Sequence, residues 1–277
     1  MVELVFKWLT FLADYCPLIV SSVVLAGVFL LLADSVKRHP LAYYIAFASP
    51  AVVYVLQQLL SSFGAGFSFQ RLPVVGEIIR EYVHVGGFGF PLLVIIMYVG
   101  ALSPRSPHVR KILMIRKELS IISGFPILVH SYVRIVHNLP SSFGFFLDTN
   151  AYMEKNEWVK SSFGAGLNHA AYLLGIFMTI LFLILWVTSF DAVRRRLGGV
   201  RWKKVQRWSY VLYAMLFLHS ILLHAGGWIS AGSGMSRGKD VALSGIIGLT
   251  STCLVFGSYL VLRLRKGRGR EKVSVEG

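Results

Sequence analysis

Charged side chains are scarce in this sequence, and acidic ones are the scarcest. Only 15% of the 277 residues are charged, whereas about a quarter of the residues of a typical soluble domain are. Asp and Glu together number 13, against 28 Lys and Arg, and 55% of the residues are hydrophobic. This composition excludes an ordinary soluble globular domain and favours an integral membrane protein.

Cysteine is nearly absent as well. The two cysteines, Cys16 and Cys253, stand far apart and neither belongs to a CxxC pair. No disulfide framework, zinc site or iron–sulfur cluster is therefore expected. The N-terminus also lacks the basic start and the small-residue cleavage site of a secretory signal, so we expect its first apolar run to remain as a membrane span.

Long apolar runs are the main feature that the sequence does contain. A helix needs about 20 predominantly apolar residues to cross the hydrocarbon layer. Such runs predict an all-α integral membrane protein, a bundle of seven transmembrane helices. The seven runs are 17–33, 41–61, 82–102, 119–138, 168–190, 206–225 and 242–263.

The basic residues are grouped in the connections that follow the first, third, fifth and seventh runs. Because positively charged connections stay in the cytoplasm, this pattern predicts an N-terminus outside and a C-terminus in the cytoplasm of a multi-pass cell (inner) membrane protein. The net charge of +15 is thus explained by topology, and nucleic acid is not expected as a partner. The four connections read "DSVKRH", "SPRSPHVRKILMIRKE", "FDAVRRRLGGVRWKKVQR" and "RLRKGRGREK".

A short motif recurs at the ends of apolar runs on the predicted outer side. "SSFGAG" occurs at 61–66 and 161–166, and "SSFGFF" occurs at 141–146. The flanking residues do not match, which argues against a duplicated domain. We interpret the motif as a Ser/Gly-rich turn whose aromatic side chain enters the membrane interface, with docking of a partner as the alternative. The aromatic residues are Phe63, Phe143 and Phe163.

Six of the eight histidines fall in the outer half of the predicted bundle. Ionisable groups in a bilayer are costly and are functional candidates by default. The other two, His39 and His108, lie in predicted cytoplasmic connections. We therefore expect some of the six to be ligands of a cofactor or metal. They are His84, His130, His137, His169, His219 and His224.

Two of these histidines are predicted to lie at the same depth on helices that run in the same direction. His130 follows Lys117 by 13 residues, and His219 follows Lys204 and Arg207 by 15 and 12. Histidine is a common axial ligand of haem iron. The sequence therefore predicts that His130 and His219 bind the iron of a b-type haem.

The remaining polar candidates have less definite roles. Arg134 follows His130 by one turn and is a candidate for pairing with a haem propionate, or it extends toward the interface. His137 lies on nearly the same face as His130, but His224 is turned by about 140° from His219, so the two do not form a second matched pair. We expect His137 and His224, like His84 and His169, to bind a quinone, a second haem or an external metal ion, or to be surface histidines.

Three segments resemble the ferric-reductase-like transmembrane family over roughly residues 82–225. The resemblance is closest to its small bacterial branch, the haem-binding membrane subunit of the methionine sulfoxide reductase system. It implies a haem-ligand role for His130 and His219. Gln206 stands where the family has another histidine, so one haem b is expected, and a second remains an alternative. The segments are "VHVGGFGFPLLVIIMYVGALSP", "RKELSIISGFPILVH" and "WKKVQRWSYVLYAMLFLH".

The resemblance also implies a domain organisation and a function. Residues 82–225 would form the haem-binding core of four helices, after two helices in 1–81 and before a last helix and basic tail in 226–277. Because only a short tail follows the last run, the electron donor would be a separate protein, a quinol or a bound flavin such as FMN. We predict electron transfer between the quinone pool, or that flavin, and an extracytoplasmic redox protein or complex subunit, in contact with membrane lipid. A non-catalytic membrane anchor of a larger complex and a histidine-relay transporter are the alternatives.

Overall fold

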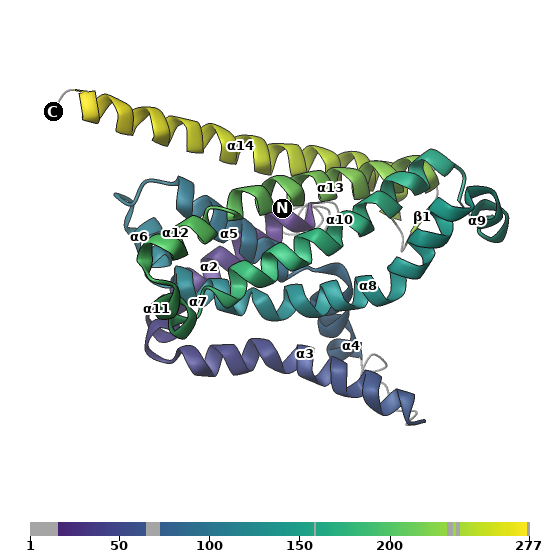
Figure 1. Cartoon of the computed structure of the whole chain (residues 1–277), viewed down its shortest axis with the longest axis horizontal. Helices are drawn as coiled ribbons and strands as arrows, with labels where there is room; N and C mark the ends of the chain where they lie inside the picture. Colours follow the sequence, from purple (N-terminus) through teal and green to yellow (C-terminus); the bar gives the residue numbers. More distant parts are fainter. Residues whose placement is uncertain (1–15, 65–72, 158, 232–234, 237–238, 276–277) are drawn as a thin grey trace, which may run out of the picture. The chain divides into compact units, whose positions relative to one another are not determined.

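The computed structural model describes residues 16–64, 73–157, 159–231, 235–236 and 239–275 (Figure 1). These residues are almost entirely helical. A two-residue antiparallel pairing joins β1 (Met235–Ser236) to β2 (Lys239–Asp240). The helices are α2 Pro17–Arg38, α3 Pro40–Ser62, α4 Pro73–Ile79, the π-helix η2 Arg80–Val85, α5 Gly89–Ala101, α6 Pro107–Met114, α7 Arg116–Ile122, α8 Gly124–Leu147, α9 Thr149–Lys155, α10 Ser162–Val187, α11 Asp191–Leu197, α12 Gly199–Gln206, α13 Ser209–Ala231 and α14 Val241–Val275.

Six helical stretches of the described chain are long and apolar enough to cross a membrane, and each overlaps one of the predicted runs. This agrees with an all-helical multi-pass membrane protein. The count of seven spans and the orientation of the chain stay predictions. The stretches are Pro17–Arg38, Pro40–Ser61, Arg116–Leu147, Ser162–Val187, Gly199–Ser230 and Val241–Lys266.

The predicted run 82–102 differs from the others because it is divided. Its first residues end the π-helix η2, which stops at Gly86 with φ of +75°. This left-handed conformation favours glycine. The apolar helix α5 then begins at Gly89 and has 13 residues, fewer than a spanning helix needs. Ten of those 13 are buried, so α5 is covered mainly by protein.

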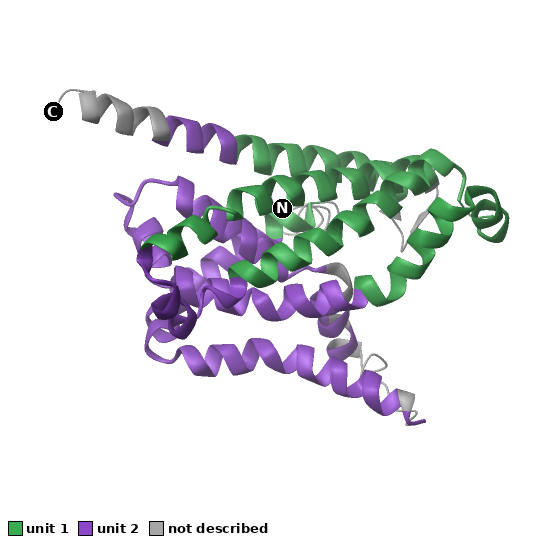
Figure 2. Ribbon diagram, viewed as in Figure 1, with its two compact units in different colours: residues 1–20, 134–185, 200–258 green, residues 21–133, 186–199, 259–277 purple. Residues whose placement is uncertain are grey.

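The chain forms two compact units, coloured separately in Figure 2. Unit 1 comprises residues 1–20, 134–185 and 200–258, and unit 2 comprises 21–133, 186–199 and 259–277. The boundary lies within α8, because Val133 belongs to unit 2 and Arg134 to unit 1. Each unit is described by itself below.

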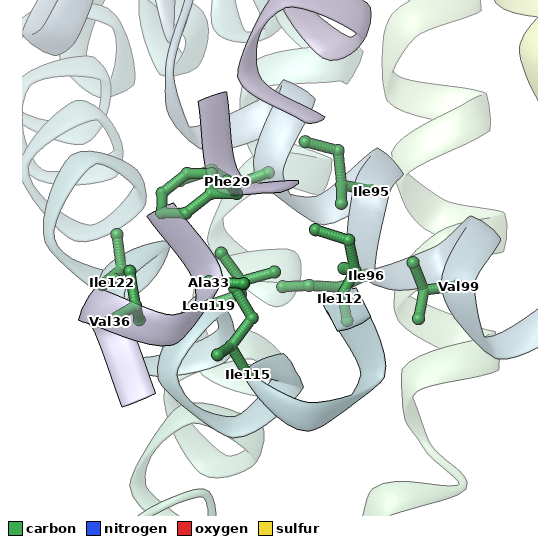
Figure 3. Close-up of a cluster of buried hydrophobic side chains, with 11 residues drawn as sticks. Phe29, Ala33, Val36, Ile95, Ile96, Val99, Ile112, Ile115, Leu119 and Ile122 are labelled. Atoms are coloured by element: carbon green, nitrogen blue, oxygen red, sulfur yellow. The ribbon is translucent and has the colours of Figure 1, made fainter. Parts of the chain in front are cut away.

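Unit 2 has an aliphatic core in which α2, α5 and α7 meet (Figure 3). Apolar side chains recur along each helix at the spacing of one face, which is why these short elements can pack together. Phe29 of α2 contributes the largest side chain of this group. The cluster is Phe29, Ala33, Val36, Leu92, Ile95, Ile96, Val99, Ile112, Ile115, Leu119 and Ile122.

Unit 1 shows a close approach between α10 and α13. A Cβ placed on Gly164 would lie 2.4 Å from the backbone nitrogen of Ser230, so only glycine lets the two backbones come this near. The Lys160 backbone N–H donates to the Ser230 carbonyl at 2.8 Å. The glycine of the second "SSFGAG" copy therefore has a packing role. The aromatic residues of the three motif copies are exposed, which fits either interpretation of the motif, the membrane interface or a docked partner: Phe63, Phe143 and Phe163.

Candidate functional site

His130 in unit 2 is held by a backbone carbonyl of the π-helix. Its Nδ1 lies 2.8 Å from the Val83 carbonyl oxygen. A carbonyl only accepts hydrogen bonds, so Nδ1 carries the hydrogen and the lone pair of the neutral ring lies on Nε2. The hydrogen bond thus selects the tautomer whose Nε2 lone pair is able to bind a metal.

The glycines after η2 make room for this arrangement. Gly86 ends the π-helix, and a Cβ placed on it would lie 3.5 Å from Cε1 of the His130 ring. A Cβ on Gly89 would lie 2.7 Å from Ile127 Cγ1, so the start of α5 lies directly against α8. The motif "HVGGFGFP" therefore brings the π-helix and α5 close to the helix that carries His130.

His219 in unit 1 has an equivalent environment. Its Nδ1 lies 2.9 Å from the carbonyl oxygen of Ala171 on α10, which again leaves the lone pair on Nε2. A glycine also faces this ring, because a Cβ on Gly175 would lie 3.7 Å from His219 Cε1. His130 and His219 thus have the same tautomer, the same kind of partner and a neighbouring glycine, each within its own unit.

This arrangement fits the chemistry of a metal-binding histidine. Such histidines almost always donate the second ring N–H to a carbonyl or carboxylate, which fixes the ring and raises its basicity. Among the described residues, no group of three or more His, Cys, Asp or Glu gathers as in a site made by protein ligands alone. A haem needs only axial ligands from the protein, so two separate histidines of this kind suit it.

Arg134 follows His130 in α8 and belongs to unit 1. It interacts electrostatically with Tyr172 of α10 and with His219 of α13. The guanidinium therefore lies near one of the two predicted ligands, where a carboxylate of a cofactor would gain a charge-assisted partner.

The other two predicted cofactor-binding histidines lie elsewhere. His137 is exposed on α8. His224 is half-buried and faces α14, because a Cβ on Gly248 would lie 2.3 Å from its Nδ1. His219 contacts α10 and His224 contacts α14, which agrees with the turn of about 140° expected from five helical residues. The side chain of His84 lies outside the described part of the chain.

His169 of unit 1 is surrounded by a hydroxyl group and several aromatic rings, which the sequence did not predict. Its exposed fraction is 4%, and its Nδ1 lies 3.0 Å from Ser142 Oγ. Ser142 Oγ donates to the Asn138 carbonyl at 2.8 Å, so it accepts from His169. The ring stacks on Phe145 with a centroid distance of 4.7 Å. No sequence signal pointed to Ser142 or Phe145 as its neighbours.

Gln206 is engaged in a helix-end contact in unit 1. Its Nε2 donates to the carbonyl of Leu185, near the end of α10, at 3.2 Å. Carbonyls in the last turn of a helix have no partner within that helix, so this amide satisfies one of them. The residue at the position of the family's additional histidine therefore has a structural contact.

Comparison with known proteins supports the resemblance at the level of the family. An uncharacterized protein of Treponema pallidum (strain Nichols) is 33% identical over 99 residues, which are 34% of this chain and 24% of that protein. The matched stretch thus spans about a quarter of that relative's length. No solved structure matches the chain. Residues 85–217, just under half of the chain, match the family described as "Ferric reductase like transmembrane component", and this match suggests a membrane redox or electron-transfer component.

Proposed function

We propose that this protein is a membrane electron-transfer protein in which His130 and His219 would hold the iron of one b-type haem. The observation that carries the proposal is the pair of equivalent hydrogen bonds, His130 Nδ1 to Val83 and His219 Nδ1 to Ala171. The equal depth predicted for the two histidines and the family match over residues 85–217 agree with it.

The roles of the surrounding residues follow from their contacts. A haem with two histidine ligands supplies reversible one-electron transfer at an iron without an open coordination site. The Val83 and Ala171 carbonyls orient the two imidazoles and raise their basicity. Arg134 would neutralise a propionate, and Gly86 and Gly175 lie beside the two rings.

We further propose one haem b per chain, because the amide of Gln206 is engaged with Leu185 and is a poor ligand for iron. The partners would be the quinone pool of the inner membrane or a bound flavin such as FMN, and an extracytoplasmic redox protein or complex subunit. The specific likeness to the methionine sulfoxide reductase subunit belongs to this proposal. The alternatives to this proposal are a haem-free membrane anchor and a histidine-relay transporter.

Absorption spectroscopy of the purified protein tests the proposal. We expect a dithionite-reduced minus oxidised spectrum of a b-type haem, and about one haem per chain by pyridine haemochrome analysis. His130→Ala and His219→Ala should each lose the bis-histidine spectrum, whereas His108→Ala, an exposed control, should keep it. A well-folded protein without haem would favour the anchor or transporter. A haem spectrum unchanged in both ligand variants would refute the ligand assignment.

A further inference from the structure

A groove of about 480 Å³ opens on unit 1 where α8 ends and α10 begins. Its volume falls in the range of small-molecule sites, about 300–1,000 Å³. Aromatic rings make up much of the lining, and none of the lining residues is charged. They are Phe145, Phe146, Thr149, Ser162, Phe163, Gly166 and Leu167.

The inner wall of this groove leads to His169. Phe145 is 4% exposed and presents its ring between the groove and His169, on which it stacks at 4.7 Å with an interplanar angle of 24°. The edge of Tyr152 closes a second side of the imidazole at 4.9 Å. A ring bound in the groove would thus be in contact with a stacked pair of aromatic groups.

From His169 a short path continues to His219 within the same unit. His169 and Ala171 are separated by one residue on α10, and the Ala171 carbonyl accepts the hydrogen bond from His219 Nδ1 at 2.9 Å. A continuous series of contacts therefore leads from the groove to a proposed iron ligand. It passes from Phe145 to His169, along α10 to Ala171, and from there to His219.

We propose that this groove is the binding site of a membrane quinone, which exchanges electrons with the haem through Phe145 and His169. This inference rests on the proposed function. A planar, uncharged ring suits the aromatic lining, and the absence of charged lining residues disfavours a flavin mononucleotide with its phosphate. Phe146 and Phe163, 51% and 67% exposed, would lie beside an apolar tail that continues into lipid.

One hydroxyl group in the lining has a defined polarity. Thr149 Oγ1 donates to the Phe145 carbonyl at 3.0 Å, so its own hydrogen is engaged and it would accept, rather than donate, a hydrogen bond with a quinol hydroxyl. The quinol would release its two electrons one at a time to the single haem proposed above, which would pass the first electron to the redox partner before it accepts the second. Its two protons pass to water at that end of the unit, and quinone remains; the reverse reaction reduces quinone.

The first test is photolabelling of the detergent-purified full chain with an azido-substituted quinone analogue, followed by peptide mapping. This measures binding whether or not haem is present. We expect the label within residues 145–167, with competition by unlabelled quinone. A label elsewhere in the chain would mean that quinone does not bind in the groove. A label displaced by excess phospholipid but not by quinone would mean that the groove holds only lipid. Either result would overturn the inference.

The second test is the rate at which a soluble quinol analogue reduces the haem, followed by stopped-flow absorption. Phe163→Ala should weaken quinol binding about fivefold to tenfold, as expected for the loss of one aromatic contact. Phe143→Ala is the matched control, because Phe143 occupies the same motif position, is 54% exposed and is absent from the groove lining. Dithionite reduction should be unchanged in both.

The outcomes separate this inference from the proposed function. If the wild-type protein shows no haem spectrum, the proposed function is wrong. Labelling still decides whether quinone occupies the groove. If the haem is intact but quinol reduces it equally fast in wild type and in Phe163→Ala, at the same half-saturating quinol concentration, only the assignment of the groove as the quinone site is wrong.

Discussion

Gly124→Ala is the substitution whose effect on this structure is the most sharply defined. Gly124 begins α8, the helix that carries His130. A Cβ at this position would lie 1.8 Å from Nε1 of Trp186, well inside van der Waals contact. The indole must therefore move, and its hydrogen bond from Nε1 to the Ile121 carbonyl, 2.9 Å long, must break.

The expected size of the effect follows from three contributions. Overpacking costs about 1–3 kcal/mol, and the lost hydrogen bond costs about 0.5–1.5 kcal/mol. The change from glycine to alanine in a helix offsets at most about 1 kcal/mol. We therefore expect the free energy of unfolding to fall by about 0.5–4.5 kcal/mol, which lowers the Tm by several degrees.

Gly144→Ala is a matched control in the same helix. A Cβ at Gly144 meets nothing within 4 Å, so the helix propensity of alanine should stabilise the protein by up to about 1 kcal/mol. Thermal unfolding of both variants in detergent, followed by tryptophan fluorescence, measures the difference. If Gly124→Ala melts at the same temperature as Gly144→Ala, the close packing of Trp186 on α8 is wrong.

Two further predictions concern a backbone position and a surface ion pair. Gly86→Ala and Gly198→Ala, with φ of +75° and +73°, should each lose about 1–2 kcal/mol of stability. Only Gly86→Ala places a methyl in contact with His130, so it alone should shift the reduction potential of the proposed haem; equal potentials in redox titration would contradict this. The hydrogen bond from Lys117 lowers the pKa of Asp191, so the stabilisation by this pair is present above the ordinary carboxyl pKa and disappears as pH falls through the lowered value. In Asp191→Asn the free energy of unfolding should therefore depend less on pH in that acid range, and an unchanged pH dependence would exclude a role for the pair.

The sequence was sufficient to predict the helical membrane class and the positions of six long apolar helices. Those depend on composition over about 20 residues, which neighbouring parts of the chain hardly alter. The run 82–102 was harder, because its hydropathy resembles that of a span. Its division depends on Gly86 adopting a left-handed conformation after a π-helix, and a glycine in a sequence does not reveal whether its φ is positive.

The contacts between distant segments were the other part that sequence reasoning did not reach. Trp186 meets Gly124 only because two helices pack together, and the pair is 62 residues apart in the chain. Likewise, the environment of His169 is made by Ser142 and Phe145 of another helix. Neither partner has a residue type that indicates a binding site, so His169 could be recognised as a candidate but its surroundings could not.

The partners of His130 and His219 show where a limit of sequence reasoning lies. Both histidines donate to backbone carbonyls, of Val83 and Ala171, and every residue type has a carbonyl, so the side chains at these positions carry no signal of that role. Gly86 and Gly175 lie beside the two rings, but a Cβ on either would be at ordinary van der Waals distance from Cε1, 3.5 and 3.7 Å. Gly86 is required instead by its φ of +75°. The sequence therefore shows two histidines in apolar helices, whereas the carbonyls that orient their rings are recognisable only once the helices have packed.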